Sequence, residues 1–549
     1  MHIAEAASGG EGDAAGPVRW GTIGGLPARP RSEIDVVQLN AANLHGLDAR
    51  IARPRYDRRA VSVGIVHLGV GGFHRAHQAA YLDTLMELGR ASTWGICGVG
   101  LLPADEAMHT ALGAQDGLYT LMARAPDGTV SARVIGSLLE HLFAPADPEA
   151  VLSRLAAPST RIVTLTITEG GYGLDPASGR FVAEDPAIAH DAAPGAVPRT
   201  VFGYLFAALR RRFDAGVSPF TVVSCDNIES NGEVARKSLA AFARLVEPGL
   251  AETIEREVAF PCSMVDRITP VTTPADRAEL ERRFGVQDRW PVVCEPFHQW
   301  VLEDHFPAGR PELEAAGVQL VADVAPYEQM KLRLLNAGHQ AIAYAGALAG
   351  YTYAHEAVAD PLIAGFLADY LRTEARPSLA PVPGIDLDQY AARLVERFSN
   401  AALGDTLARL CAQSSDRIPR FVVPVIAENL AAGRPIRRGA AILASWARYA
   451  EGRGEHGEEL LVEDARRDEV MARARAQAKD PLAFVRDPTL FGDLAEHETF
   501  RAAYLPALDA FHRFGARRAL AALTASTPGG AYRVCPIAIS RVSPPPPMI

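Results

Sequence analysis

The stretch VSVGIVHLGVGGFHRAHQAAYLDTLMELG, residues 61–89, decides the fold that we expect for this chain. Its β-branched, apolar run from Val61 to Leu68 predicts a buried strand. A glycine-rich turn follows, and the apolar spacing from Arg75 to Leu88 then predicts a helix. A strand, a glycine turn and a helix in this order are the arrangement that binds a dinucleotide.

The glycine turn is therefore the first candidate site for a cofactor. Glycines let the backbone approach a pyrophosphate, whose charge is favoured at a helix N-terminus. The third glycine of the G-x-G-x-x-G pattern is replaced by His74, so an ordinary tight turn is the alternative interpretation. The residues that we expect to contact the cofactor are Gly69, Val70, Gly71, Gly72, Phe73 and Arg75.

A second strand is predicted in WGICGVGL, residues 94–101, and Asp105 follows it. A carboxylate in this place can accept hydrogen bonds from an adenosine ribose, which favours NAD over NADP. Its distance from Gly69 exceeds the usual ~20 residues. A helix-capping role for Asp105 is the alternative.

Two further predicted strands end in polar side chains. RIVTLTIT, residues 161–168, runs into Glu169, and FTVVSCDN, residues 220–227, ends at Asn227. Parallel α/β sheets bind ligands at the carboxyl ends of their strands. One such residue is commonly only a cap, but several strands that end alike predict a cleft.

The pattern changes to helix after helix from about Tyr327 through Arg518, and this half begins with KLRLLNAGHQ, residues 331–340. On an α-helix, Lys331, Asn336 and His339 would point at about 0°, 140° and 80°, so all three can face one cleft. A lysine can act as a general acid or base, and an asparagine amide can donate to a developing oxyanion. The alternative is a polar flank of an amphipathic helix.

Composition narrows the class of protein. The chain has 549 residues, 48% hydrophobic and 22% charged, which indicates a globular protein of two or more domains. Its net charge of −10 argues against nucleic acid or an anionic membrane as a partner. No run approaches the ~18 apolar residues of a membrane span. The N-terminus has no apolar signal region, and the six cysteines are dispersed without zinc-site spacing, so we expect a cytoplasmic protein without metal.

We therefore predict an α/β fold with four regions. A disordered N-terminal extension covers residues 1–35, and an expanded Rossmann-type NAD-binding domain covers residues 36–323. A mostly α-helical substrate-binding and catalytic domain follows at residues 324–530, and an irregular tail at residues 531–549.

Taken together, the motifs resemble those of a known family. IVHLGVGGFHRAHQAAY, WGICGVGLLPAD, TLTITEGGY, SCDN, MVDRITPVTT, WPVVCEPF and MKLRLLNAGHQ occur in this order. The series resembles the polyol-specific long-chain dehydrogenase/reductase family, also called the mannitol dehydrogenase family, from about residue 40 to about residue 520.

The resemblance implies metal-independent, reversible oxidation of D-mannitol to D-fructose with NAD. It implies that Lys331 is the general acid/base and that Asn227 and Asn336 hold the reacting oxygen. His339 would orient the substrate, and Glu169 would pass the lysine proton to solvent. It also implies substrate contact by Asp266, Arg409 and Arg417, although a solvated face is an equal alternative for the two arginines.

Other functions remain open at this point. D-arabinitol dehydrogenase and a fructuronate- or mannonate-type hexuronate reductase are alternatives within the same family. A catalytically silent dinucleotide sensor would not need Lys331, Asn227, Asn336 and His339 together, and the spacing of cysteines and histidines disfavours a zinc alcohol dehydrogenase. The expected partner is a small polyol or ketose, without nucleic acid or membrane, and we expect a monomer.

Overall fold

The computed structural model describes residues 36–175 and 179–525, which form two compact units. The first unit runs to Met330 and includes Pro381–Asp386 and Ala402–Gly404; the second contains Lys331–Ala380, Leu387–Ala401 and the described chain from Asp405 onward. The predicted N-terminal extension (1–35) and C-terminal tail (531–549) lie outside the described residues. Each unit is described by itself.

A five-stranded, fully parallel sheet is the centre of the first unit. Its strand order is β6-β3-β2-β7-β8. After β2, the chain adds β3 and β6 on one side of β2, and it then adds β7 and β8 on the other side. This reversal is the topological switch point at which such sheets bind ligands. The strands are β2 (Val63–Leu68), β3 (Gly95–Gly100), β6 (Leu138–Phe143), β7 (Ile162–Leu165) and β8 (Thr221–Ser224).

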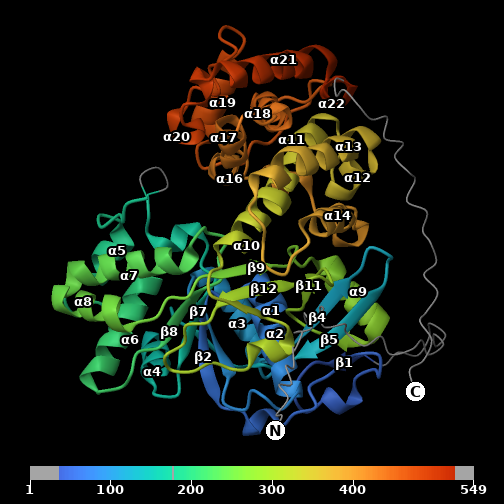
Figure 1. Ribbon diagram of the computed structural model, residues 1–549. Helices are drawn as coiled ribbons and strands as arrows, with labels where there is room; N and C mark the ends of the chain where they lie inside the picture. Colours follow the sequence, from blue (N-terminus) through green and yellow to red (C-terminus); the bar gives the residue numbers. More distant parts are fainter. Residues whose placement is uncertain (1–35, 176–178, 526–549) are drawn as a thin grey trace, which may run out of the picture. The chain divides into compact units, whose positions relative to one another are not determined.

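Both faces of this sheet are covered, which explains why its strands read as continuous apolar runs. Alternate residues of β2 enter different cores: Val66 and Leu68 pack on one face, and Ile65 packs on the other. Four helices cover the first face: α4 (Pro148–Ala156), α6 (Val201–Asp214), α7 (Asn231–Val246) and α8 (Pro248–Glu257) (Figure 1). The other core includes α1 (Gly72–Ala76), α2 (Gln78–Glu87) and α3 (Glu106–Gly113).

Three smaller sheets complete the first unit. Antiparallel β4 (Tyr119–Arg124) and β5 (Val130–Ile135) form a hairpin, with β11 (Val292–Cys294) beside β4. A second sheet joins β9 (Ser263–Asp266), β12 (Gln299–Glu303) and β13 (Gln319–Val321), and a short pair joins β1 (Val37–Gln38) and β10 (Val286–Gln287). Helices α5 (Pro186–Asp191), α9 (Pro274–Phe284) and α10 (Ala325–Met330) also belong to this unit.

The second unit is helical in its described residues, and α11 (Ala337–Leu348) lies at its core. Ten of the first eleven α11 residues, and Leu348 at its end, are buried, because α13, α15 and α18 pack around the helix. Figure 1 shows α13 and α18 beside α11. The other helices are α12 (Ala354–Ala359), α13 (Pro361–Tyr370), α14 (Leu387–Phe398), α15 (Leu407–Cys411), α16 (Ser414–Phe421), α17 (Val423–Ala431), α18 (Arg437–Tyr449), α19 (Arg467–Ala476), α20 (Pro488–Phe491), α21 (Glu498–Phe514) and α22 (Ala516–Ala525).

Two helix predictions need correction. The single helix expected from Arg75 to Leu88 is divided into α1 and α2, because His77 leaves helical geometry with φ −119° and ψ −89°. The segment expected to be α-helical from Lys331 is instead a π-helix, η6 (Lys331–Asn336), before α11 begins. The second change alters which side chains share a face.

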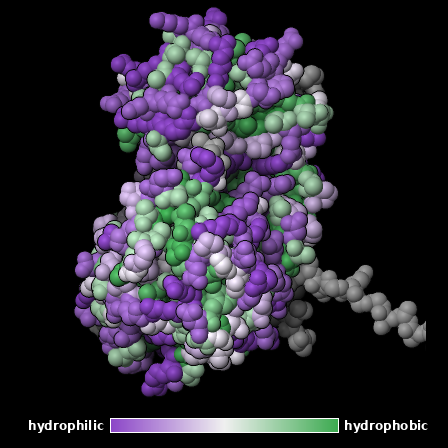
Figure 2. Space-filling view, turned by 90° about the vertical axis from the view of Figure 1, so that its left-hand side faces the viewer, coloured by the Kyte–Doolittle hydropathy of each residue, from purple (hydrophilic) through white to green (hydrophobic). Residues whose placement is uncertain are grey.

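The exposed surface of both units is predominantly polar on the face that Figure 2 shows, where hydrophobic residues occur in groups interrupted by hydrophilic ones. Large exposed hydrophobic side chains come from separate segments, for example Leu102, Val271 and Leu461. Among the described helices, none has the length and apolar character that crossing a membrane requires.

Candidate active site

The turn after β2 requires its first glycine for steric reasons. Gly69 has φ +90°, a region that favours glycine. A Cβ atom at Gly69 would also lie 2.3 Å from the backbone oxygen of Thr166, which follows the neighbouring strand β7. The chain therefore passes closely over the end of β7, and only glycine fits there.

The next two glycines have a different explanation. A Cβ at Gly71 would meet nothing nearer than 3.9 Å, and one at Gly72 nothing nearer than 3.6 Å. The protein's own packing would therefore tolerate a Cβ atom at either position. Because glycine occupies both, the backbone at the carboxyl edge of the sheet is not covered by side chains there. This open backbone fits the close approach that a dinucleotide's pyrophosphate needs.

His74, in place of the third glycine, is part of a buried imidazole pair. Its ring stacks on His67 of β2 with 3.4 Å between ring centroids. His67 is in turn within hydrogen-bonding distance of the hydroxyl groups of Thr164 and Thr166. Burial lowers the pKa of His67 to about 3, so this ring is neutral at ordinary pH. Stacked imidazoles therefore join helix to strand where the usual motif has glycine.

Asp105 stands after the second strand of the sheet, as expected, and its carboxylate has a structural task. Oδ2 accepts hydrogen bonds from the backbone N–H groups of Leu101 and Leu102, both at 2.9 Å. The capping interpretation of Asp105 is thus correct for one oxygen. Because both bonds end at Oδ2, contact between the other oxygen and a ribose stays a prediction.

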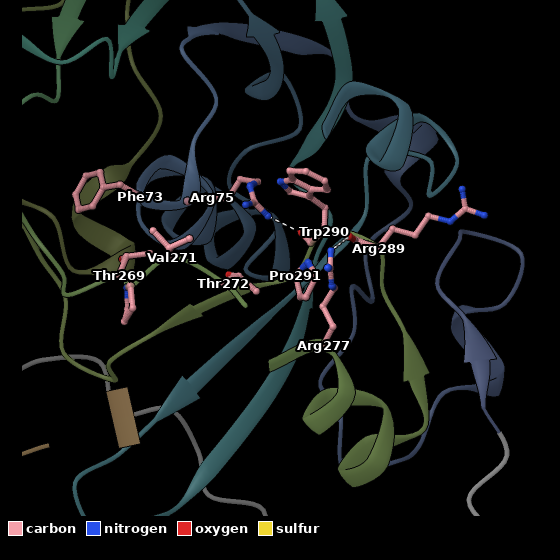
Figure 3. A pocket seen from close by; sticks show the side chains of 11 residues that line it. Phe73, Arg75, Thr269, Val271, Thr272, Arg277, Arg289, Trp290 and Pro291 are labelled. Carbon is pink, nitrogen blue, oxygen red and sulfur yellow. Dashed lines mark hydrogen bonds between the residues drawn. The ribbon is translucent and has the colours of Figure 1, made fainter. Parts of the chain in front are cut away.

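A pocket of about 480 Å³ opens beside the glycine turn in the first unit. Gly72, Phe73 and Arg75 form one wall, and the opposite walls come from Thr269–Thr272, from Arg277 of α9 and from Arg289–Pro291 (Figure 3). Arg75 is 4% exposed, and its Nη1 donates to the backbone oxygen of Trp290 at 2.6 Å. Three of the seven predicted cofactor residues thus line one cavity.

The ends of β7 and β8 bring two predicted catalytic residues to the same edge of the sheet. Glu169 follows Thr168, whose positive φ of +58° is strained for a residue other than glycine. Asp226 supports this turn, because its carboxylate accepts from the backbone of Ile167 and Thr168 and from the hydroxyl of Tyr172. Burial raises the pKa of Asp226. Sequence reasoning missed Asp226, although its place at a strand end beside Asn227 was a usable signal.

Asn227 and Asp266 differ in exposure within the same unit. Asn227 is exposed just past β8, whereas Asp266 ends β9 and is 4% exposed. Its neighbour Arg267 is fixed by hydrogen bonds to the backbone oxygens of Ala76 and Glu295. The residue next to Asp266 is therefore bonded to Ala76, the last residue of α1.

In the second unit, the π-helical turn η6 carries Lys331 and Asn336 at its two ends. A π-helix closes hydrogen bonds between residues i and i+5, so its first and sixth residues come together on one face. Lys331 and Asn336 have this spacing, and the 140° separation expected for an α-helix is wrong here. Lys331 is 6% exposed, so its amine is held in a largely buried place.

Asn336 and His339 each leave a buried polar atom unsatisfied. Among the described residues, neither Asn336 Oδ1 nor His339 Nε2 has a hydrogen-bond partner. His339 stacks on Phe398 with 4.1 Å between ring centroids, and burial lowers its pKa to about 3. Unsatisfied buried polar groups are costly, and they commonly mark places that a ligand completes.

Arg333 anchors the π-helical turn and was not singled out in the sequence. Its guanidinium donates to the backbone oxygen of Ser378 at 2.5 Å and to both carboxylate oxygens of Glu428 at 2.6 and 2.7 Å. Arg333 lies two residues after Lys331 and is 7% exposed. Because these partners are far away in the chain, no local sequence pattern indicated the anchor.

Arg409 and Arg417 lie close to each other in the second unit. Arg417 Nη1 donates to the backbone oxygens of Arg409 and Leu410 at 2.9 and 3.0 Å. The guanidinium of Arg409 forms a bidentate ion pair with Asp405, with both bonds at 2.6 Å. Burial opposes it, but Arg409 holds the pKa of Asp405 below its usual value. The charges of both arginines also reach His339.

The six predicted catalytic and substrate-binding residues outside η6 thus divide between the units. Asn227, Glu169 and Asp266 belong to the first, and His339, Arg409 and Arg417 lie with Lys331 and Asn336 in the second. Within residues 36–175 and 179–525, no three His, Cys, Asp or Glu side chains are grouped so that they could hold a metal ion.

Comparison with known sequences defines the class to which this fold and these sites belong. The profile described as the mannitol dehydrogenase Rossmann domain matches residues 63–315, and the mannitol dehydrogenase C-terminal domain matches residues 323–512. The chain therefore belongs to the mannitol dehydrogenase family. This membership confirms the resemblance, the Rossmann-plus-helical fold class and the expectation of an oxidoreductase.

Individual relatives cover nearly the whole chain. Mannitol 2-dehydrogenase of Phaeosphaeria nodorum is 47% identical over 89% of this chain and 86% of its own. The Aspergillus fumigatus enzyme of the same name is 46% identical over 88% of this chain and 98% of its own.

Two solved structures share the fold. Pseudomonas fluorescens mannitol 2-dehydrogenase, in a ternary complex with NAD and D-mannitol, has a TM-score of 0.83 and 43% identity over 89% of this chain and all of its own. A D-sorbitol dehydrogenase in substrate-free form has a TM-score of 0.81 and 38% identity over 88% of this chain and all of its own.

Proposed function

We propose that this protein catalyses the reversible oxidation of D-mannitol to D-fructose with NAD. The observation that carries the proposal is the match to mannitol 2-dehydrogenases over nearly the full chain, one of them solved with NAD and D-mannitol. The open backbone at Gly71 and Gly72 supports the cofactor half of this proposal, since it leaves room for a diphosphate beside the sheet. We also retain the expectation of a cytoplasmic monomer as a proposal.

NAD, when bound, supplies the acceptor for the hydride that leaves the alcohol carbon. The protein must then accept the hydroxyl proton and stabilise the alkoxide-like oxygen. We assign proton acceptance to Lys331, a residue that is 6% exposed and lies at the start of η6. In ketose reduction the same amine donates the proton.

Asn227 and Asn336 are assigned to hold the reacting oxygen through their side-chain amides. For Asn336 this role is supported by its place on the same π-helical face as Lys331. His339 is assigned to orient the substrate: its neutral ring has an unsatisfied Nε2, which can bond a sugar hydroxyl. Glu169, exposed at the end of β7, is assigned to exchange the lysine proton with solvent.

The choice of a neutral polyol over a hexuronate is supported by Arg409. A site selective for a uronate should offer a guanidinium to its carboxylate. The guanidinium of Arg409 is already neutralised by the bidentate pair with Asp405. Binding a second carboxylate there would break that pair, so hydroxyl groups are the better match.

Sorbitol is a specific second candidate, because a D-sorbitol dehydrogenase shares the fold with a TM-score of 0.81. D-arabinitol and D-mannonate are also tested, because they are the substrates of the two alternative activities within the family. The deciding experiment measures kcat/KM with NAD for mannitol, sorbitol, arabinitol and mannonate at one pH. Mannitol should give the highest value, with fructose as the product; a higher value for any other substrate would reassign the function within the family.

A further inference from the structure

A fully buried carboxylate in the second unit has no role in the function proposed above. Glu374 belongs to a second π-helical segment, η7 (Leu371–Ala375). Its two carboxylate oxygens accept from the backbone N–H groups of Arg438 and Gly439, at 2.6 and 2.7 Å. These two residues belong to the first turn of α18, so the carboxylate caps that helix at the end where the helix dipole favours negative charge.

The backbone at Gly439 is fitted to this contact. A Cβ atom there would lie 3.3 Å from Glu374 Oε2 and 2.7 Å from Ile426 Cγ1 of α17. Glycine therefore lets the N-terminus of α18 approach both the carboxylate and α17 closely. Helix α18 in turn packs against α11, the helix that follows η6 and carries His339.

One line of contacts joins Glu374 to Arg333, the residue that anchors η6. The Arg333 guanidinium donates to the backbone oxygen of Ser378, and the Ser378 hydroxyl donates to the backbone oxygen of Ala375 at 2.7 Å. Ala375 directly follows Glu374 and ends η7. The anchor of η6 is therefore bonded to the same short segment that holds the carboxylate.

A second line of contacts closes the ring through α17. The same guanidinium donates to both carboxylate oxygens of Glu428, and the next residue, Asn429, is fully buried. Asn429 Nδ2 donates to the backbone oxygen of Glu374 at 2.9 Å. Arg333 and Glu374 are thus connected twice, and a closed ring of bonds transmits a displacement of either residue to the other.

The protein keeps this carboxylate at a cost to its stability. Burial raises the pKa of Glu374 to about 7, although the N–H groups and the charge of Arg438 lower it; Asp369 raises it further. The phenol of Tyr370 also faces the carboxylate. Because an unfolded glutamate has a pKa of about 4.3, stability falls as pH rises from there through the folded pKa. A buried acid retained against this cost is expected where positioning matters more than stability.

We propose that Glu374 is a positioning residue for the π-helical turn Lys331–Asn336. Its carboxylate fixes η7 on the N-terminus of α18, and the ring through Arg333 passes this constraint to η6. Glu374 acts through Arg333 rather than on the substrate. The inference rests on the proposed function only in treating Lys331 as the group that transfers the proton.

The position of Lys331 can be followed without any substrate, because the chain has only three lysines, Lys237, Lys331 and Lys479. Trace acetylation with acetic anhydride, read by mass spectrometry, gives the labelling rate of each lysine. Lys331 is 6% exposed, whereas the other two are exposed and serve as internal references in the same sample.

The full-length wild type is compared with Glu374→Gln, which keeps the shape of the side chain and removes its charge. Glu356→Gln is the matched control, because Glu356 also accepts from two backbone N–H groups in the second unit but caps α12, outside the ring. For each protein, kcat is measured with the substrate of highest kcat/KM, and NADH affinity is measured by fluorescence.

Glu374→Gln should raise the labelling rate of Lys331 about threefold or more relative to the other lysines, because the turn then opens more often. The kcat should fall about tenfold, while the dissociation constant for NADH stays the same. Glu356→Gln should change none of these values. Arg333→Met opens the ring at its opposite side, so it should also raise Lys331 labelling, and the double variant should label no faster than the faster single variant.

An unchanged labelling rate of Lys331 in Glu374→Gln, or a kcat within about threefold of wild type, would overturn the proposal. That result would hold even if the variant unfolded more easily, because Glu374 would then only stabilise the fold. Labelling that rises further in the double variant would also overturn it, since the two residues would act independently. Because labelling needs no substrate, inactivity on mannitol would contradict the proposed function and leave the labelling result intact.

Discussion

The glycine turn of the first unit and the π-helical turn of the second place functional groups by opposite means. At the glycine turn, the backbone needs a residue without a side chain. A Cβ atom on Gly69 would lie only 2.3 Å from the backbone oxygen of Thr166. At the π-helical turn, side chains are present and a distant anchor holds the backbone, since Arg333 bonds to Ser378 and Glu428. The first solution is local, and the second depends on tertiary contacts.

Both turns leave buried polar atoms unsatisfied. Around the glycine turn, Thr166 and His67 bond to each other and to the backbone oxygen of Gly69, whereas both ring nitrogens of His74 and Arg75 Nε have no partner among the described residues. The helices of the second unit leave Asn336 Oδ1 and His339 Nε2 without partners among the described residues. What distinguishes the glycine turn is therefore its open backbone, since a Cβ at Gly71 or Gly72 would meet nothing nearer than 3.6 Å.

The strongest way to break the comparison is to fill the glycine turn. Gly69→Ala should lower the free energy of unfolding by about 3 kcal/mol or more, because a positive φ and a backbone clash coincide. Gly128→Ala is the matched control: Gly128 has φ +81°, but its Cβ would meet nothing within 4 Å, so we expect about 1 kcal/mol. Denaturant unfolding of both variants measures this; equal losses would show that the close approach to Thr166 carries no cost.

A second change removes the amide at the other turn. Asn336→Ala should lower kcat for mannitol oxidation about 100-fold, which is typical for loss of one donor to a developing oxyanion. The dissociation constant for NADH should stay unchanged, because Asn336 belongs to the second unit. Steady-state kinetics and NADH fluorescence separate the two effects. A kcat within threefold of wild type would remove Asn336 from the reaction.

A third change tests the anchor rather than the site. Arg333→Met should lower kcat about tenfold, because it releases the π-helical turn, and NADH affinity should stay unchanged. Because Arg333 and Glu428 act as one pair, adding Glu428→Gln to Arg333→Met should lower kcat no further. Arg372→Met is the control, since Arg372 is on the second π-helical segment, η7 (Leu371–Ala375), and is largely exposed beside Asp369. If Arg333→Met changed thermal stability but not kcat, Arg333 would be structural only.

The smallest effect concerns pH and His339. Its pKa, lowered by burial to about 3, means that the folded protein stays unprotonated there while the unfolded chain binds a proton below about pH 6.5. Stability should therefore fall as pH decreases from 6.5 towards 3. His339→Gln should reduce the loss between pH 7.5 and 5.5 by about 1 kcal/mol, measured by denaturant unfolding. An identical loss in both proteins would contradict a neutral, buried His339.

Local chemistry explains which parts could be predicted from the sequence. The strand and glycine turn at residues 61–72 and the polar ends of β7 and β8 depend on neighbouring residues, and the structure contains all of them. The order of the sheet, β6-β3-β2-β7-β8, then follows the rule for doubly wound folds.

The departures have tertiary causes. The π-helical turn depends on Arg333 partners 45 and 95 residues away in the chain, which no periodicity reveals. The break at His77 accompanies a contact between His77 Nε2 and the backbone oxygen of Gln299, 222 residues further on. Asp226 and the arginine-lined pocket were missed for the same reason, because their partners are assembled only by folding.

Lys331 provides the most direct test of the account, since it is assigned the proton of the reacting alcohol. The measurement compares kcat for mannitol oxidation and the dissociation constant for NADH in wild type and Lys331→Ala. We predict a kcat at least 100-fold lower with NADH affinity largely intact, because a general acid/base contributes ~100-fold or more. A variant that keeps more than about a tenth of the wild-type kcat would contradict the assignment of proton transfer to Lys331.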